Sequence, residues 1–388
     1  MRILTAGESH GPKLTTIMEG VPSGLSLSLD DVNAELARRQ TGCGRGDRMK
    51  IENDRIYFTS GVRHGFTTGA PITMVVENKD FKNWQTVMNS ETVSDKEQEL
   101  RRLHQPRAGH ADLVGGEKYR HKDLRNILER SSARETTMRV AIGAVAKRIL
   151  TELGIFVAGH VVNLGGIFVS IPDSLSAQEI WKKSNVSDLR IIDIEKEEMM
   201  KELIKQAKQT GDTLGGIVEV VVDGVPAGVG SYVQFDRKFD GCLAQAMVSI
   251  NAFKGVEFGL GFESANFSGS KVMDEIVWDK NRGYSRKTNR LGGFEGGMTN
   301  GMPLIIRGVM KPIPTLYHPL MSVDIDTHEP SQASVERSDV TAVPAASVVA
   351  EAVIAFEVAN ALCKQFTSDS IEQLVEAIVI QRRYLKEF

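Results

Sequence analysis

The sequence is poor in cysteine, in aromatic residues and in charge of one sign. Its 388 residues include only three cysteines, Cys43, Cys242 and Cys363, with no CxxC motif and no Cys/His spacing suited to zinc. Free thiols and no metal site are therefore expected. Aromatic residues make up 6% of the chain and the formal net charge is −3. Without stacking clusters or a general positive field, we expect no nucleic-acid partner.

Membrane segments and common nucleotide-binding loops are also missing. The first residues, Met1–Glu8, have no apolar segment after Arg2, and we expect no apolar run of membrane-spanning length. These absences predict a cytoplasmic protein with no membrane partner. The sequence has no GxxxxGK[ST] loop and no GxGxxG after a predicted strand, so neither a P-loop hydrolase nor a dinucleotide-binding domain is indicated.

Glycine is abundant, with 36 residues, and some of it belongs to an internal repeat. Three pairs of similar segments recur in the same order: Gly7–Leu25 with Gly211–Val229, 68–72 with 300–304, and 129–131 with 336–338. Chance likeness between turns explains any one pair, but three pairs in one order favour duplication. We predict a single domain over 1–388 with two related halves, roughly 1–205 and 206–388.

Each half has the same predicted order of elements. Residues 15–18 and 217–222 have the pattern of strands that end in Gly-Val-Pro turns. The Glu-Arg-Ser triplets lead into long helices, and Ser132 with Glu135 predicts a capping box that opens the first one. Gly154 is expected to end that helix. The apolar faces of the strands and of the helices in both halves must all be buried. The simplest arrangement that does so is an α+β fold with packed helices between two outer sheets.

Two polar stretches, 83–101 and 188–210, interrupt this pattern. Both are polar and rich in charge. We interpret them as surface excursions.

Two loops near the N-terminus have a composition suited to catalysis or anion binding. In Gly7–Gly11, His10 is placed where an imidazole meets a ligand, although a turn histidine with a structural hydrogen bond is the alternative. Residues 38–48 hold four arginines, including Arg39 and Arg45, among three glycines. This mixture favours carboxylate or phosphate binding over a solvated basic loop.

Three further segments carry candidate residues. The two predicted helix entrances, 129–134 and 336–339, offer hydroxyls and arginines to a phosphate, and Asp339 is either a proton acceptor or an N-cap. The loop 106–112 carries His110. The segment 311–315 is either a rigid turn or, through its lysine and threonine, part of a site for an anionic cofactor.

Taken together, these segments resemble a known family. GESHGPKLTTIMEGVP, ERSSARETTMRVAIGAV and RSDVTAVPAASVVAEAV are similar to the three signature segments of bacterial-type chorismate synthases. RRQTGCGRGDRM, QPRAGHAD, GGFEGGMTNGMP and KPIPT resemble further family segments in the family's order. The resemblance runs from near Met1 to about Glu351.

The resemblance implies a fold and a reaction. The fold is a homotetramer of β-α-β sandwich subunits, each with a helical core between antiparallel sheets and two pseudo-symmetric halves. The reaction is the anti-1,4-elimination of phosphate from 5-enolpyruvylshikimate-3-phosphate (EPSP), which gives chorismate, the last common intermediate of aromatic amino-acid biosynthesis by the shikimate pathway. It requires reduced FMN without net redox change.

The resemblance also implies a role for individual residues. The implied catalytic residues are His10, which protonates the departing phosphate, His110, which lies by the flavin's pyrimidine edge, and Asp339, which helps to take up the substrate proton through flavin N5. The implied substrate-binding residues are Ser9, Arg39, Arg45, Arg134 and Arg337. The implied flavin-binding residues are Arg107, Arg130, Ser131, Ser132, Asn251, Ala252, Gly296, Lys311, Pro312, Ile313, Pro314, Thr315 and Arg337.

Two other functions remain open from the sequence. One is an oxidoreductase that uses flavin and NADPH, with NADPH also a candidate reductant of the flavin in a chorismate synthase. The lack of GxGxxG and of an extra domain favours an external flavin reductase for that purpose. The second is a non-enzymatic binder of phosphorylated ligands.

Overall fold

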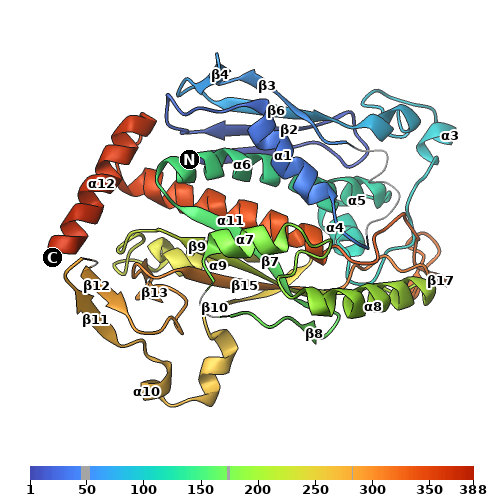
Figure 1. Ribbon diagram of the computed structural model, residues 1–388. Coiled ribbons are helices and arrows are strands. Elements are labelled where there is room, and N and C mark those ends of the chain that lie inside the picture. Colours follow the sequence, from blue (N-terminus) through green and yellow to red (C-terminus); the bar gives the residue numbers. More distant parts are fainter. Residues whose placement is uncertain (45–52, 173–174, 282) are drawn as a thin grey trace.

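The computed structural model describes residues 1–44, 53–172, 175–281 and 283–388. Its elements form three layers, in which long helices lie between two antiparallel sheets (Figure 1). This arrangement confirms the α+β prediction of a helical core between outer sheets. All three cysteines are free thiols.

The first sheet is built from the N-terminal part of the chain. Its strands lie in the order β1-β2-β6-β3 and all neighbouring pairs are antiparallel. The strand bounds are β1 Arg2–Ala6, β2 Lys13–Glu19, β3 Ile56–Ser60 and β6 Ile72–Glu77, with a small hairpin of β4 Val62–Arg63 and β5 Phe66–Thr67. Buried and exposed positions alternate along β2, so one face of the sheet covers the core.

The second sheet has the strand order β10-β15-β9-β7-β8, again antiparallel throughout. Its strands are β7 Phe156–Leu164, β8 Ile167–Phe168, β9 Gly216–Asp223, β10 Phe253–Phe258 and β15 Leu304–Met310, with a hairpin of β13 Phe294–Glu295 and β14 Met298–Thr299. The valines of β9 are buried on both faces, which explains their near-continuous apolar run.

Four helices fill the layer between the sheets. They are α1 Leu29–Gln40, α6 Thr136–Glu152, α9 Phe239–Val248 and α11 Val343–Gln365. The two longest, α6 and α11, cross closely at Gly143, where an added Cβ would lie 2.3 Å from the Cβ of Ala352. Glycine is therefore required there by packing. Gly154 ends α6 with φ of 66°, as predicted.

The two halves repeat hydrogen bonds as well as elements. In the first half, the Thr67 hydroxyl donates to the Pro22 carbonyl at 2.6 Å and accepts from the Leu25 N–H at 3.0 Å. In the second half, Thr299 makes the equivalent bonds, donating to the Pro226 carbonyl at 2.7 Å and accepting from the Val229 N–H at 3.0 Å. This agreement supports the two pseudo-symmetric halves. Their boundary near residue 205 stays a prediction.

The remaining elements lie around this three-layer body. The helices are α3 Asp95–Gln98, α4 Asp112–Tyr119, α5 Arg125–Ser131, α7 Ala177–Ser184, α8 Glu197–Gln209, α10 Gly269–Val272 and α12 Ile371–Glu387. The strands are β11 Ile276–Asp279, β12 Gly283–Arg286, β16 Met321–Val323 and β17 Pro330–Gln332. Short 3₁₀ turns cover Lys79–Asn83, Ala133–Glu135, Ile194–Lys196, Phe235–Arg237 and Gly261–Asn266.

Two predictions about helices were wrong. Ser132 accepts from the N–H of Arg134 and caps a 3₁₀ turn, so the capping box with Glu135 does not form and α6 begins at Thr136. The helix α11 is long and apolar enough to cross a membrane by length and composition alone, although 78% of its most apolar window is buried inside the protein. Such burial is typical of a central core helix.

Candidate active site

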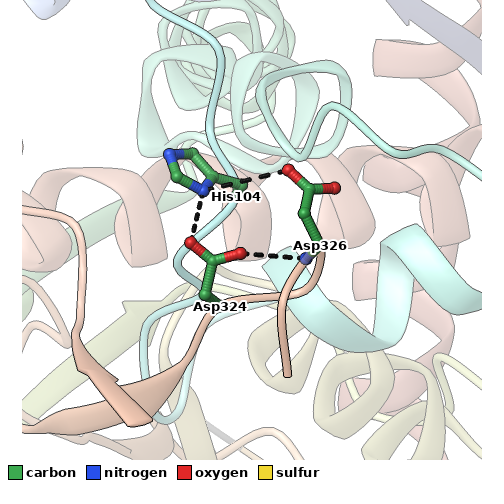
Figure 2. Close-up of side chains that lie close together, drawn as sticks. All are labelled: His104, Asp324 and Asp326. Atoms are coloured by element: carbon green, nitrogen blue, oxygen red, sulfur yellow. Dashed lines mark hydrogen bonds and ion pairs between the residues drawn. The ribbon is translucent and has the colours of Figure 1, made fainter. Parts of the chain in front are cut away.

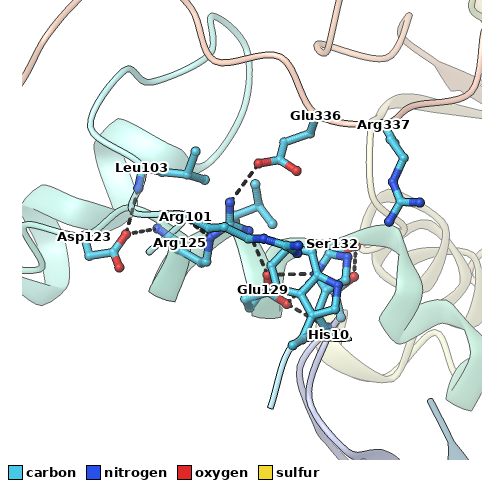
Figure 3. Close-up of polar contacts among 12 residues, drawn as sticks. His10, Arg101, Leu103, Asp123, Arg125, Glu129, Ser132, Glu336 and Arg337 are labelled. Atoms are coloured by element: carbon cyan, nitrogen blue, oxygen red, sulfur yellow. Dashed lines mark hydrogen bonds and ion pairs between the residues drawn. The ribbon is translucent and has the colours of Figure 1, made fainter. Parts of the chain in front are cut away.

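The loop between β1 and β2 carries His10, and its contacts fix it against Glu129 near the end of α5 (Figure 3). The N–H of Ser9 donates to the Glu129 carbonyl at 2.9 Å, and the N–H of His10 donates to Glu129 Oε2 at 2.7 Å. The His10 ring meets the same carboxylate, with Nδ1 2.9 Å from Oε1. Both side chains are buried, with 8% and 2% exposure.

Trp84 and two arginines complete the surroundings of His10. The rings of His10 and Trp84 are stacked, with centroids 3.8 Å apart and planes 21° apart. The guanidinium of Arg101 lies 3.9 Å from the Trp84 centroid. Arg125 donates to Glu129 at 3.2 Å and to Glu336 at 2.9 Å, so it links α5 to the chain that leads into α11. Cation–π and ionic contacts therefore hold the imidazole in place.

A cavity of about 830 Å³ lies beside this cluster. Its charged lining residues are Arg101, Arg102, Arg125, Arg337, Asp80 and Glu336. Four cations against two acids in a partly enclosed space favour an anionic ligand. The cavity walls also include the indole of Trp84, so the stacked pair stands at the cavity edge.

Arg337, a predicted substrate-binding residue, is held at the cavity by Asp80. Its guanidinium donates to Asp80 Oδ2 at 3.1 Å, while its side chain remains 56% exposed. Burial acts to raise the pKa of Asp80, but hydrogen bonds from Asn83 and Trp84 and the charge of Arg337 bring the pKa below its usual value. The ionised carboxylate of Asp80 thus positions Arg337. Much of the Arg337 side chain remains accessible to a ligand.

His110 belongs to a second cluster. Its Nδ1 lies 2.6 Å from Asp112 Oδ1, and Arg107 donates to Asp112 Oδ2 at 2.9 Å and to the Thr315 hydroxyl at 2.7 Å. Burial favours a higher pKa for Asp112, but the hydrogen bonds from His110 and Arg107 bring it well below its usual value. The structure therefore joins the loop of His110 to the segment 311–315 through Arg107, which ionised Asp112 holds in place.

Several residues expected to bind flavin come together beside this cluster. The Asn251 amide donates to the Ser131 carbonyl at 2.9 Å, and the Lys311 N–H donates to the Ala252 carbonyl at 3.0 Å. With the bond from Arg107 to Thr315, these contacts connect residues from four separate parts of the sequence.

These residues fit an anionic, hydrogen-bonding cofactor. Burial and the nearby charge of Lys254 lower the pKa of Lys311, and an anion between the two lysines would relieve that repulsion. The buried Oδ1 of Asn251 has no hydrogen-bond partner in the described part of the chain. Ala252 is held at φ of 70°, a strained conformation that is typical of ligand clamps.

Other predicted residues are placed differently. Arg39 and Arg134 are buried at 6% and 7% exposure and both face Asp54, with Arg134 also donating to Asn78 at 2.7 Å. Arg130 donates to the carbonyls of Thr5 and Gly7. Arg45 lies outside the described residues.

Gly296 is also apart from the other flavin residues. It lies at the exposed turn between β13 and β14, beside the start of α9, where Phe239 donates to the Gly297 carbonyl. Asn251 follows the other end of α9, so this ten-residue helix, about 15 Å long, separates the two.

The region of the Glu-Arg-Ser triplets differs from the prediction of helix entrances. Residues 129–131 form the last turn of α5, and the helix α11 begins only at Val343. Its N-cap is Ala342, without a side-chain cap, so Asp339 is not the N-cap of α11. Ser132 donates to the Ser9 hydroxyl at 3.2 Å, next to His10.

Known proteins share this sequence and fold. The chain matches the family model described as chorismate synthase over residues 1–363. It is 66% identical to the chorismate synthase of Enterococcus faecalis and 62% identical to that of Lactococcus lactis, over all of both chains. A crystal structure of chorismate synthase matches with a TM-score of 0.81 and 41% identity, over 100% of this chain and 98% of the other.

The chain belongs to the chorismate synthase family. As a member it is a lyase that serves aromatic amino-acid biosynthesis. The family resemblance inferred from the seven sequence segments is thereby confirmed.

Sequence reasoning had missed several residues around His10. Trp84 and Arg101 belong to the segment 83–101, which was interpreted as a surface excursion; this was wrong for Trp84, which is buried against His10, whereas Arg101 is exposed and lines the cavity. A lone tryptophan in a polar stretch was the available signal. Arg125 and Glu129, four residues apart on one helix face, were detectable as an ion pair but not as partners of His10.

One further trio of side chains has the composition of a metal site. The trio consists of His104, Asp324 and Asp326 (Figure 2). His104 comes from the segment before the His110 loop, and the two aspartates come from the turn of the β16–β17 hairpin. His104 Nδ1 lies 2.7 Å from Asp324, but Arg102 donates to Asp326 at 2.8 Å and supplies a cation there. The trio therefore ties the cavity-lining Arg102 to the hairpin.

Proposed function

We propose that this protein converts EPSP to chorismate and phosphate by anti-1,4-elimination, with reduced FMN and without net redox change. The observation that carries the proposal is the arginine-lined cavity of about 830 Å³ beside His10. EPSP carries two carboxylates and a phosphate, about three to four negative charges near neutral pH. Arg337 and the other cavity arginines supply the matching charge.

Each cluster has a separate task in this reaction. His10 gives a proton to the departing phosphate, which makes phosphate a better leaving group. Asp339 helps to take up the proton that the ring loses on the other side of the substrate. Arg39, Arg45, Arg134 and Ser9 contribute to substrate binding, with Arg39 and Arg134 shaping the site from their buried ion pairs with Asp54.

The second cluster is the proposed flavin site. Ser131, Asn251, Ala252, Lys311 and Thr315 hold the cofactor, and His110 with Arg107 lies at its edge. Bound reduced FMN supplies transient electron density for the elimination. The remaining assignments, Arg130, Ser132, Pro312, Ile313, Pro314 and Gly296, are part of the same proposal. We also propose a cytoplasmic homotetramer that receives its reduced flavin from an external reductase, with NADPH the alternative reductant.

Replacing His110 with alanine is expected to lower turnover roughly tens- to thousands-fold, because a positioned acid–base group is lost. Folding should persist, since Asp112 keeps its ion pair with Arg107. Turnover is measured anaerobically with chemically reduced FMN, alongside a thermal unfolding curve. A wild-type rate in this variant contradicts the role of His110.

Replacing Asp339 with asparagine is expected to separate cofactor binding from catalysis. The amide keeps the shape of the side chain but cannot accept the substrate proton, so turnover should fall at least about tenfold. Flavin binding, followed by fluorescence, should persist. Loss of both together shows that Asp339 supports the structure and is not a proton acceptor.

The decisive experiment for the function is anaerobic conversion of EPSP. Chorismate absorbance and phosphate release are followed together with reduced FMN, with oxidised FMN, and with FMN plus NADPH. Equal amounts of both products, formed only with reduced flavin, support the proposal. Tight flavin binding without turnover favours an NADPH-dependent oxidoreductase, and EPSP binding without any product favours a phospho-ligand binder.

A further inference from the structure

Glu129 contacts both the backbone and the ring of His10, and it lies outside the groups that the proposed reaction uses. The backbone N–H groups of Ser9 and His10 both donate to it, and the imidazole contacts its carboxylate. The His10 N–H donates to Oε2 at 2.7 Å, and the ring Nδ1 lies between the two oxygens, 2.9 Å from Oε1 and 3.1 Å from Oε2. This geometry fixes both the position and the rotation of the ring.

The protonation state of Glu129 decides what the contact does. Burial acts to raise the pKa of Glu129, but the hydrogen bonds from the His10 ring and N–H and the charge of Arg125 bring the pKa below its usual value. An ionised carboxylate has no hydrogen to donate. The Nδ1 atom of His10 must therefore carry the hydrogen of this bond, whether the ring is neutral or protonated.

We infer that Glu129 is a positioning residue that locks the Nδ1–H tautomer of His10, so that Nε2 is the nitrogen that exchanges a proton with the ligand. This inference rests on the proposed function. In the proton transfer, the Nε2–H bond breaks and an O–H bond forms on the departing phosphate. The imidazole is left neutral, with its hydrogen still on Nδ1 and donated to the carboxylate of Glu129, which stays ionised throughout.

The other charged groups around the imidazole are consistent with this role. Arg125 donates to Glu129 Oε1 and keeps it ionised, while Asp80 lies close enough to interact with the His10 charge. Trp84 stacks on the ring with its plane tilted by only 21°, which opposes rotation about the ring's attachment. Glu129 and Trp84 together restrict the imidazole to one orientation.

The first test is the Glu129→Gln variant. Its amide has the same shape, but its NH₂ group can donate to Nδ1 and so stabilise the opposite tautomer. We expect kcat to fall about 10²-fold or more with KM little changed. Glu129→Asp, which keeps the charge, should recover part of the lost kcat. Glu135→Gln is the matched control, because Glu135 is also buried but pairs with Arg139, and it should behave as wild type.

A double-mutant cycle distinguishes positioning from general structural support. If Glu129 acts through His10, adding Glu129→Gln to His10→Ala causes no further loss of kcat. Losses that multiply in the double variant overturn the inference, as does a wild-type kcat in Glu129→Gln.

A spectroscopic measurement on the free enzyme needs neither substrate nor flavin. With ¹⁵N-labelled histidine, the His10 resonances of the wild type should show a protonated Nδ1 and an unprotonated Nε2 at alkaline pH, and Glu129→Gln should mix or reverse this pattern. An unchanged pattern in the variant overturns the inference even where turnover falls. Absence of chorismate formation by the wild type refutes the proposed function instead, and leaves the tautomer to be decided by these spectra.

Discussion

Replacing His10 with alanine is expected to lower the rate of chorismate formation roughly tens- to thousands-fold. Under the proposed mechanism the variant loses the proton donor for the departing phosphate, whereas the cavity arginines proposed to bind the substrate remain. The protein should still fold, because His10 lies in a loop outside the main apolar core and Glu129 retains its ion pair with Arg125. Single-turnover measurements with reduced FMN separate the chemical step from product release.

The control for this experiment is His121→Ala. His121 is an exposed histidine after α4 whose ring contacts Asn126 at 3.3 Å, away from the cavity. It should retain the wild-type rate and unfolding temperature. Normal single-turnover rates in His10→Ala contradict the role of His10 as proton donor. If His10→Ala loses the folded state, His10→Gln is the milder replacement. His10→Gln must then fold and still show the loss of rate.

Replacing Glu351 with alanine is expected to destabilise the protein by about 3–5 kcal/mol. Glu351 is fully buried on α11, where it accepts from Arg38 at 2.8 Å, from Lys147 and from the Gly159 N–H at 2.7 Å. Its removal leaves two partly buried cations, Arg38 and Lys147, with Glu35 as their shared acid. Urea unfolding of both proteins at neutral pH measures the difference.

The same prediction has a pH dependence. Burial opposes ionisation, but Arg38 and Lys147 lower the pKa of Glu351 from 4.5 to about 2. A lowered folded-state pKa contributes stability above the unfolded value, and this stability is lost as pH falls through the folded value. The gap between wild type and Glu351→Ala should therefore be full above pH 4.5 and shrink towards pH 2.

Glu357 on the same helix provides the matched control. It is only half-buried, and burial raises its pKa, so its charge is not a source of stability at neutral pH. Glu357→Ala should cost no more than about 1 kcal/mol. Equal losses in the two variants would show that the buried ion network contributes nothing specific.

The sequence allowed the layered fold to be predicted because its signals are local. Apolar periodicity and the repeated Gly-Val-Pro turns fix which residues face the core, and these are properties of neighbours along the chain. The same patterns failed at element boundaries, as at Ser132, because a 3₁₀ turn and an α-helix begin with the same residue types. The expectation of no apolar run of membrane-spanning length also failed at α11, because a long core helix that is buried on most sides is apolar over a similar length.

Within the site, the sequence by itself determined which segments carry acid–base and anion-binding groups: the His10 loop, the His110 loop, the Arg337–Asp339 segment and the segment 311–315. Only the tertiary structure decided which of these groups meet. It paired His10 with Glu129 across 119 positions and Arg107 with Thr315 across 208. It also placed Arg39 and Arg134 in buried ion pairs with Asp54. The physical reason is that hydrogen bonds and ion pairs act over a few ångströms in space, and the packing of two sheets on a helical layer, not distance along the chain, sets that separation.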